Sequence, residues 1–186
     1  MATHSGLTSA SDLHICKGVA TATAGQVPIA DGAASQAMGF VNPHGGCYFS
    51  NIGAAATVTA PSAYTKVAPT TVANGAAVEW TEGTNARLTY TGTSTLDAII
   101  TVNVSASQAS GANRDLNFTL YKNGSAITGT ETVVTTVTAV KEHVSMTFVA
   151  ANLATNDYIE LYVKNAGGAE NVSVYSLNMS AVSMRG

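Results

Sequence analysis

The chain has 186 residues, of which 46% are hydrophobic and only 10% are charged, and its formal net charge is −3. This hydrophobic content and low net charge exclude a chain that is disordered throughout. The Lys and Arg residues number 8 and are spread singly along the sequence, whereas nucleic-acid binding needs several of them on one face, so that class is excluded as well.

No targeting or membrane-spanning segment stands out. No stretch approaches the roughly eighteen consecutive apolar residues of a membrane helix, and the first eleven residues lack the charged and apolar regions of a signal peptide. We therefore expect synthesis in a cytoplasm, where Cys16 and Cys47 stay reduced. Because two cysteines do not make a disulfide framework, we expect buried free thiols.

The N-terminal part of the chain differs from the rest. Between Ser5 and Gly39 the sequence shows no sustained alternation, only Ala, Thr, Gly and turn-forming pairs such as Asp31-Gly32. Such a segment cannot bury enough of its own surface to become ordered alone. We predict an extended arm over residues 1–44, which lies on a neighbouring subunit or on another protein.

From about Leu88 onward, apolar residues alternate with polar ones at the period of half-buried β-strands. The Val- and Thr-rich stretch from Thr132 to Val140 predicts a further strand. At Asn123-Gly124 the sequence predicts a tight hairpin turn, because both residue types adopt a positive φ readily. The expected inward residues are Ile100, Val102, Val104 and Ala106, then Leu116, Phe118 and Leu120, then Val144, Met146 and Phe148, and finally Ile159, Leu161 and Val163.

The last predicted strand, Asn171 to Met184, changes phase in its middle. Val172 and Val174 mark one face, whereas Tyr175, Leu177, Met179 and Ala181 mark the opposite one. Either a bulge lies near Val174, or both faces are buried, and the second option implies a partner. Helix signals are nearly absent. The predicted fold class is all-β, an antiparallel sandwich or jelly roll.

Three stretches carry a resemblance to a known group of proteins: Asn85 to Thr95, Leu120 to Ile127, and Leu153 to Asn165. Their strand and turn sequences resemble the jelly-roll domains of structural proteins in tailed bacteriophages, whose fold is similar to that of tumour necrosis factor (TNF) and C1q heads. The segment from His14 to Gly39 likewise resembles the N-terminal regions that precede such domains in phage head and tail proteins.

The resemblance implies a TNF/C1q-like jelly roll at residues 45–186 that forms a homotrimer, preceded by the arm at 1–44. It implies a virion structural protein at the capsid surface, made in the cytoplasm of the bacterial host. In this role a capsid decoration (cement) protein binds the major capsid protein through its arm and stabilises the head shell. The alternative is a tail- or head-fibre module that presents distal loops, such as Ser107 to Asp115 or Ala166 to Glu170, to a host surface glycan.

Particular residues are candidates for these contacts. Tyr is favoured at interfaces because it buries area and keeps a polar tip. The candidate trimer-interface residues are Tyr158, Tyr162, Tyr175, Leu177 and Met179, and the candidate capsid-contacting arm residues are His14, Ile15, Lys17, Val27 and Ile29. Trp80 lies beside Glu79 and Glu82, a combination seen in sugar-binding sites, against the alternative of a core aromatic.

The sequence gives little support for catalysis, metal binding or a cofactor. The acidic residues are scattered and no Gly-x-Ser-x-Gly motif is present, so we expect no enzyme activity. The pair Gly45-Gly46 lacks the Lys-Ser/Thr of a phosphate loop and predicts a turn. Two His-Cys groups could together supply four zinc ligands: His14 with Cys16, and His44 with Cys47. Their spacing matches no zinc-binding motif, so we expect buried reduced thiols and hydrogen-bonded histidines instead.

Overall fold

A computed structural model describes residues 27–30, 38–41, 45–50, 55–59, 62–73, 77–83 and 85–184, with the backbone alone described for the first two ranges. The chain divides into two compact units, Met1–Asn42 and Pro43–Gly186. This division lies two residues from the boundary expected between the arm and the jelly roll.

In the first unit, two short strands pair where the sequence predicts only an extended arm. Strand β1 (Val27–Ala30) runs antiparallel to β2 (Met38–Val41), with Val27 opposite Val41 and Ile29 opposite Gly39. Val, Ile and Phe favour strands, but each run is too short to show the alternation on which the prediction relied.

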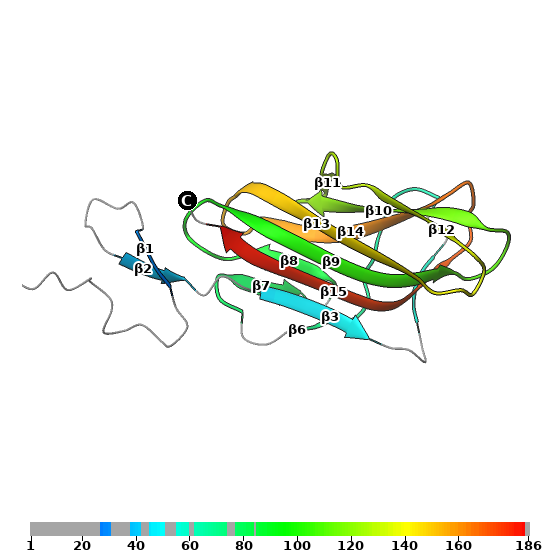
Figure 1. Cartoon of the computed structure of the whole chain (residues 1–186), viewed down its shortest axis with the longest axis horizontal. Coiled ribbons are helices and arrows are strands. Elements are labelled where there is room, and N and C mark those ends of the chain that lie inside the picture. The colour runs from blue at the N-terminus through cyan, green and yellow to red at the C-terminus, as the bar shows by residue number, and fades with distance from the viewer. Residues whose placement is uncertain are drawn as a thin grey trace, which may run out of the picture. The chain divides into compact units, whose positions relative to one another are not determined.

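The second unit consists of two antiparallel β-sheets (Figure 1). One sheet has the order β13-β9-β15-β3-β6, and β4 also pairs with β15. The other has the order β11-β10-β14-β8-β7, and here β12 pairs with β10 and β5 with β14. The strands are β3 (Gly45–Ser50), β4 (Ala56–Val58), β5 (Thr65–Lys66), β6 (Val72–Ala73), β7 (Trp80–Gly83), β8 (Arg87–Tyr90), β9 (Leu96–Gln108), β10 (Arg114–Lys122), β11 (Ser125–Ala126), β12 (Thr132–Thr136), β13 (Glu142–Leu153), β14 (Tyr158–Ala166) and β15 (Val172–Met184).

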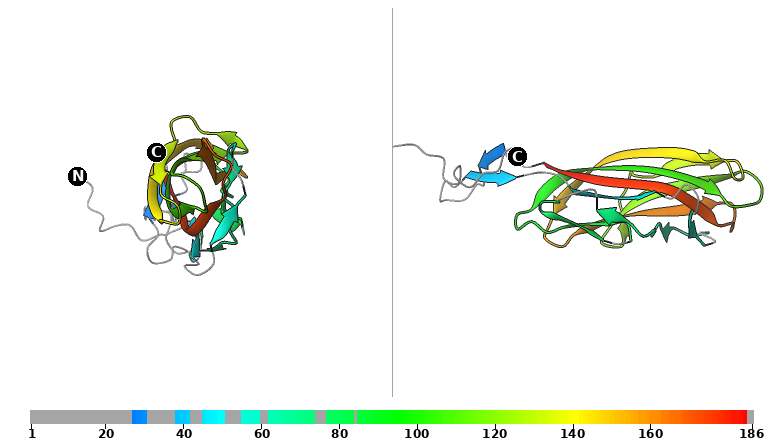
Figure 2. Two further views of the ribbon diagram at one scale, coloured as in Figure 1. Left: turned by 90° about the vertical axis from the view of Figure 1, so that its right-hand side faces the viewer. Right: turned by 90° about the horizontal axis from the view of Figure 1, so that it is seen from below.

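The order of the main strands defines the fold. In chain order these strands are β3, β8, β9, β10, β12, β13, β14 and β15, and successive members belong to different sheets except β10 and β12, which pair directly. The last strand, β15, lies between β3 and β9, as Figures 1 and 2 show. This is the double Greek-key connection of a jelly roll. The predicted antiparallel jelly-roll sandwich is confirmed.

The core lies between the two sheets and is filled by alternate residues of each strand. On β9, Ile100 and Val102 are fully buried, whereas the intervening Thr101 is partly exposed. The inward residues predicted for β10 and β14 are fully buried as well, and on β13 only Phe148 is partly exposed. The alternation in the sequence therefore identifies the buried face of the long strands.

The predicted hairpin turn between β10 and β11 is present. Asn123 and Gly124 have φ angles of 51° and 77°, and the flanking Tyr121 pairs with Ala126. Two consecutive positive φ angles match the right-handed twist of the strands that the turn joins. The local sequence therefore sets both the place and the type of this turn.

A β-bulge explains the phase change in β15. The register of β15 against β9 shifts between Val174 and Ser176, so Tyr175 is the additional residue. After the bulge, Leu177 and Met179 return to the buried side, on which Val174 also lies. The first of the two predicted options is therefore correct, and no partner is needed to cover a second apolar face.

The strand predicted from Thr132 to Val140 is shorter in the structure. Strand β12 ends at Thr136, and the next residues turn, with Ala139 at a φ of 61° and the Val140 amide donating to the Val137 carbonyl. Val137 and Val140 are exposed. Strand propensity was therefore overridden by the turn that leads to β13.

Gly45 lies inside strand β3, so the turn predicted at Gly45-Gly46 is wrong. A Cβ atom on Gly45 would lie only 2.5 Å from the Cβ atom of Trp80. Glycine is needed here because the β3 backbone passes directly against the indole side chain, rather than because of a turn.

We expect Gly45→Ala to destabilise the fold by about 1–3 kcal/mol, because the added methyl group overpacks the contact with Trp80. The measurement is the thermal unfolding midpoint at fixed protein concentration. Ser125→Ala, at an exposed position of β11 in the other sheet, is the control and should leave the midpoint nearly unchanged. Equal midpoints for wild type and Gly45→Ala would contradict this account.

Candidate functional site

Trp80 lies in the core and is unavailable for stacking on a sugar. Its side chain is 2% exposed and packs against Tyr90, with ring centroids 5.5 Å apart. Its Nε1 donates a hydrogen bond to Ser183 Oγ at 3.0 Å, and the neighbouring Glu82 accepts one from the Gly46 amide at 3.2 Å. The predicted glycan contact at Trp80 is therefore wrong, and the alternative of a core aromatic is correct.

Cys47 is a buried thiol, as predicted. Burial raises its pKa to about 11, so almost no reactive thiolate forms near neutral pH. The other possible zinc ligands, His14, Cys16 and His44, lie outside the described residues. Within the described part of the chain, no group of His, Cys, Asp and Glu residues could hold a metal ion, and no helix is long and apolar enough to cross a membrane.

The candidate trimer-interface residues do not share one surface. Leu177 and Met179 are buried in the core of the chain itself, so they cannot contact another subunit, and this part of the prediction is wrong. Tyr158 and Tyr162 lie on the outer side of β14, and Tyr175 lies at the bulge of β15 in the other sheet. The bulge, which returns residues 177 and 179 to the core, is the reason for the error.

The candidate arm residues are not tested by the structure. His14, Ile15 and Lys17 lie outside the described residues. Val27 and Ile29 lie in β1, for which the backbone alone is described. Their contact with a capsid stays a prediction.

The outer side of the sheet β13-β9-β15-β3 has no formal charge over four consecutive rows of paired residues. We call this surface the uncharged face. One row holds Asn103 of β9 between Ser145 and Asn178, followed by Tyr48. Together the four rows consist of Val149, Ile99 and Val182; Thr147, Thr101, Ser180 and Gly46; Ser145, Asn103, Asn178 and Tyr48; and His143, Ser105, Ser176 and Ser50.

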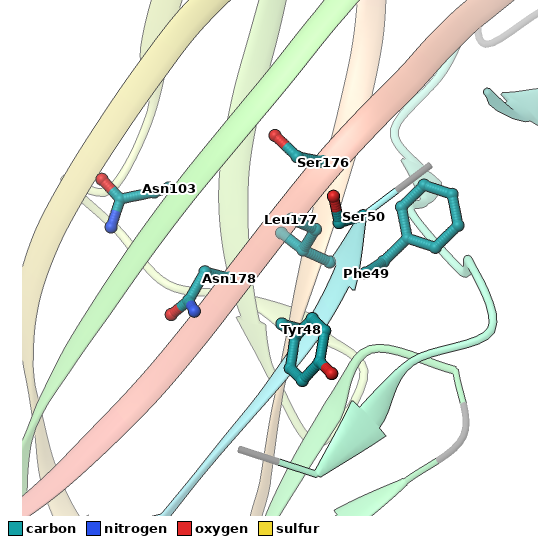
Figure 3. A pocket seen from close by; sticks show the side chains of 7 residues that line it. All are labelled: Tyr48, Phe49, Ser50, Asn103, Ser176, Leu177 and Asn178. Carbon is teal, nitrogen blue, oxygen red and sulfur yellow. The ribbon is translucent and has the colours of Figure 1, made fainter. Parts of the chain in front are cut away.

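The uncharged face has an open hollow of about 350 Å³ where β3, β15 and β9 lie side by side. Figure 3 shows Asn103, Asn178 and Tyr48 around it, one from each strand. At the end of the face, Val149 and Val182 flank Ile99 and are both more than 40% exposed. Small hydroxyl and amide groups beside exposed apolar ones suit contact with another surface, because interface cores are depleted in charge.

The outer side of the other sheet is, in contrast, aromatic and charged. We call it the tyrosine face and define it by Tyr64, Lys66, Arg87, Asn117, Tyr121, Tyr158, Glu160, Tyr162 and Lys164. These residues lie on strands β5, β8, β10 and β14 or directly beside them. The pairs Tyr121–Glu160 and Glu160–Arg87 are direct neighbours across the strands, so their side chains share one side of the sheet.

Glu160 lies at the centre of the tyrosine face and joins two cations. Its Oε1 accepts from Lys66 Nζ at 2.5 Å and from Arg87 Nε at 2.7 Å. Burial by itself would raise the pKa of Glu160, but the hydrogen bonds from Lys66 and Arg87 outweigh it and hold this pKa below its usual range. The carboxylate therefore ties β5 and β8 to β14.

The tyrosine rings of this face form a connected network. Tyr121 and Tyr162 are stacked with centroids 3.8 Å apart, and Tyr64 is tilted against Tyr121 at 6.2 Å. Burial, and then the carboxylate of Glu131, raise the pKa of Tyr64 to about 12. Burial, followed by the charge of Glu160, raises the pKa of Tyr162. The phenols of Tyr64 and Tyr162 therefore stay neutral at physiological pH.

The two loops named as glycan-presenting candidates lie together at one end of the sandwich. The Ala109 amide donates to the Asn171 carbonyl at 2.9 Å, and Arg114 lies 3.7 Å from Glu170. A hollow of about 440 Å³ lies between them, lined by Ala109, Ser110, Ala169, Glu170 and Asn171. Their proximity does not by itself test glycan binding.

Sequence reasoning identified Tyr158 and Tyr162 but missed the partners that make this face a unit. The outward phase of β14 was visible, since Glu160 and Lys164 alternate with the buried Ile159, Leu161 and Val163. Lys66 and Arg87, however, lie 94 and 73 residues away from Glu160 along the chain. No local pattern connects residues at such separations.

Several solved structures are similar to this chain, whereas no protein-family model and no curated protein matches it. Murine APRIL is 10% identical, with 75% of this chain and 98% of that one covered and a TM-score of 0.47. The vertex protein P5 of PRD1 is 13% identical, with 88% and 84% covered and a TM-score of 0.45. Eiger TNF from S. frugiperda is 12% identical, with 77% and 94% covered and a TM-score of 0.49. The jelly-roll assignment rests on the strand order described above.

We expect Glu160→Gln to lower stability near neutral pH by about 1–2 kcal/mol, because Lys66 and Arg87 lose their carboxylate but are partly exposed and can be rehydrated. The folded pKa of Glu160 is depressed, so its contribution is present above the unfolded pKa of roughly 4.3 and is lost as the pH falls through the folded value. The difference in unfolding midpoint between wild type and variant should therefore shrink in acid.

The measurement is thermal unfolding from pH 7 down to about pH 3, a range that spans the ordinary pKa of Glu. Glu142→Gln, on β13 of the other sheet, is the matched control. A difference between wild type and Glu160→Gln that stays constant with pH would show that the ion cluster contributes nothing that depends on the Glu160 charge.

Proposed function

We propose that the protein is a structural component of a tailed-phage virion, a homotrimeric capsid decoration protein whose N-terminal arm binds the major capsid protein. The observation that carries the proposal is the uncharged face of the sheet β13-β9-β15-β3. The resemblance of its strand and turn sequences to phage structural proteins supports the context. The jelly-roll fold is compatible with this role, but a fold by itself does not specify one.

The uncharged face supports self-association because copies of one surface meet there. A face that carried Lys or Glu would bring like charges together around a symmetry axis, and each such contact would be repulsive. Ser, Thr and Asn side chains can instead hydrogen-bond to their own copies. The exposed Val149 and Val182, on either side of the half-buried Ile99, add apolar area to be buried.

The arm is the proposed attachment to the capsid. A protein that binds only the assembled shell stabilises that shell by mass action. The stabilising free energy grows with the logarithm of the ratio of the protein's concentration to its Kd. A trimer presents three arms, and once one arm is bound the others act at high effective concentration. Residues 1–44 thus bind the capsid, and the three arms of one trimer raise the overall affinity for it.

We expect the wild-type protein to be a trimer in size-exclusion chromatography with light scattering, and Val182→Asp to weaken that trimer at least about tenfold. The substitution places three carboxylates on the shared face. Val133→Asp is the control, since Val133 is also an exposed valine but lies on β12 in the other sheet. A wild-type monomer of 18.8 kDa at micromolar concentration, or equal dissociation of both variants, would refute the assignment of the face.

We expect a variant that begins at Gly45 to stay trimeric but to lose most of its binding to phage heads, because the arm supplies the capsid contact. Co-sedimentation of labelled protein with purified heads measures this, and the full-length chain is the reference. If the shortened trimer sediments with heads as tightly as the full chain does, the arm is not the attachment.

A further inference from the structure

We propose that Lys164 and Asn117 become joined by an intramolecular isopeptide bond, with Glu131 moving the proton. The bond links β14 to β10 on the outer side of their sheet. This inference goes beyond the role of a decoration protein, because it depends on neither the uncharged face nor the arm. It concerns a covalent modification that the folded chain performs on itself.

Strand register places the two reacting side chains next to each other. Asn117 of β10 lies directly opposite Lys164 of β14, and both belong to the tyrosine face. The Cβ atoms of directly opposite residues are about 4.5–5.5 Å apart, and lysine carries its amine on a flexible four-carbon stem. The Lys164 amine can therefore reach the Asn117 amide.

The Asn117 amide is nearly buried and is held in one orientation. Its side chain is 9% exposed, and its Nδ2 donates a hydrogen bond to Glu131 Oε1. Because a carboxylate accepts and cannot donate, this contact fixes which end of the amide is the nitrogen. The Oδ1 atom is buried and has no hydrogen-bond partner among the described residues. The leaving nitrogen thus faces an acid–base group, and the carbonyl oxygen is free for a donor.

Tyr64 lies against the same three side chains. It leads into β5, which pairs with β14 on the side away from β10, and its ring centre is 4.9 Å from Lys164 Nζ. After burial, Glu131 and Asn117 are the groups that shift the pKa of Tyr64, so its hydroxyl lies near both. This hydroxyl has no hydrogen-bond partner in the described part of the chain. It can donate to Asn117 Oδ1 as negative charge develops there.

The reaction is the attack of an amine on an amide, and it balances without an oxidant or a reductant. The neutral amine of Lys164 attacks Asn117 Cγ, so that a new C–N bond forms and the bond between Cγ and Nδ2 breaks. Glu131 accepts the proton that the amine loses and returns it to Nδ2, which leaves as ammonia. Tyr64 first, and then Asn117, hold the pKa of Glu131 below its usual range, so a carboxylate is present to accept the proton near neutral pH.

Proximity decides whether this reaction is fast enough. Amides resist amines in dilute solution, but well-oriented groups within one molecule reach effective molarities of about 10⁵–10⁸ M. A positioned acid–base group adds roughly 10²–10⁴-fold, and each chain needs to react only once. Because only the neutral amine attacks, the bond should form faster in mild alkali than at neutral pH.

The test is intact-mass spectrometry of the full-length protein after incubation at neutral pH and in mild alkali. We expect wild type to become lighter than its sequence by the mass of one ammonia. Lys164→Arg, which keeps the charge, and Asn117→Ala should both retain the full mass, and Glu131→Gln should slow the loss at least about tenfold. Lys66→Arg, on the same face, is the matched control and should lose ammonia as wild type does.

Tandem mass spectrometry of a digest locates the loss, because Asn123-Gly124 can also release ammonia by forming a succinimide. A peptide in which Asn117 is joined to Lys164 supports the proposal. Wild type that retains its full mass in mild alkali overturns it, as does an ammonia loss that maps to Asn123-Gly124 or persists in Lys164→Arg. Thermal unfolding checks that each variant is folded. The mass of the denatured chain does not depend on oligomeric state, so none of these outcomes affects the light-scattering test of the trimer.

Discussion

One side of each long strand must be buried between the two sheets, and the other features of this structure follow from that burial. The chain has few large side chains, so the core is made from alternate Val, Ile, Leu and Phe residues on strands such as β9, β10 and β14. Because one side of each long strand is buried in this way, only the opposite side contributes to the outer surfaces of the sandwich. The glycine at position 45 and the bulge at Tyr175 serve the same constraint, since one admits Trp80 into the core and the other keeps Leu177 in it.

The two outer surfaces of the sandwich differ in the types of residue that they carry. One carries small hydroxyl, amide and apolar groups without formal charge over four rows, and the other carries tyrosines with an ion cluster around Glu160. The tyrosine face holds Lys66, Arg87, Glu160 and Lys164, whereas the four rows of the uncharged face hold no Asp, Glu, Lys or Arg.

Errors in the sequence-based predictions share one cause. The assignment of Leu177 and Met179 to an interface follows from interpreting the phase change of the last strand as a second buried face, whereas the structure has a bulge near Val174. Acidic residues flank Trp80 as they do in sugar-binding sites, but one of them, Glu82, accepts a hydrogen bond from the Gly46 amide. In both cases a local pattern was compatible with two environments, and only the neighbouring strand distinguished them.

The fold class, the buried face of the long strands and the hairpin at Asn123-Gly124 are predictable from the sequence, because alternation and turn conformation are properties of consecutive residues. The pairing of distant strands, in contrast, brings Lys66 and Arg87 to Glu160 and stacks Tyr121 on Tyr162. The same pairing leaves four rows of one sheet face without charge. Those features depend on pairing between residues tens of positions apart, which a local pattern does not encode.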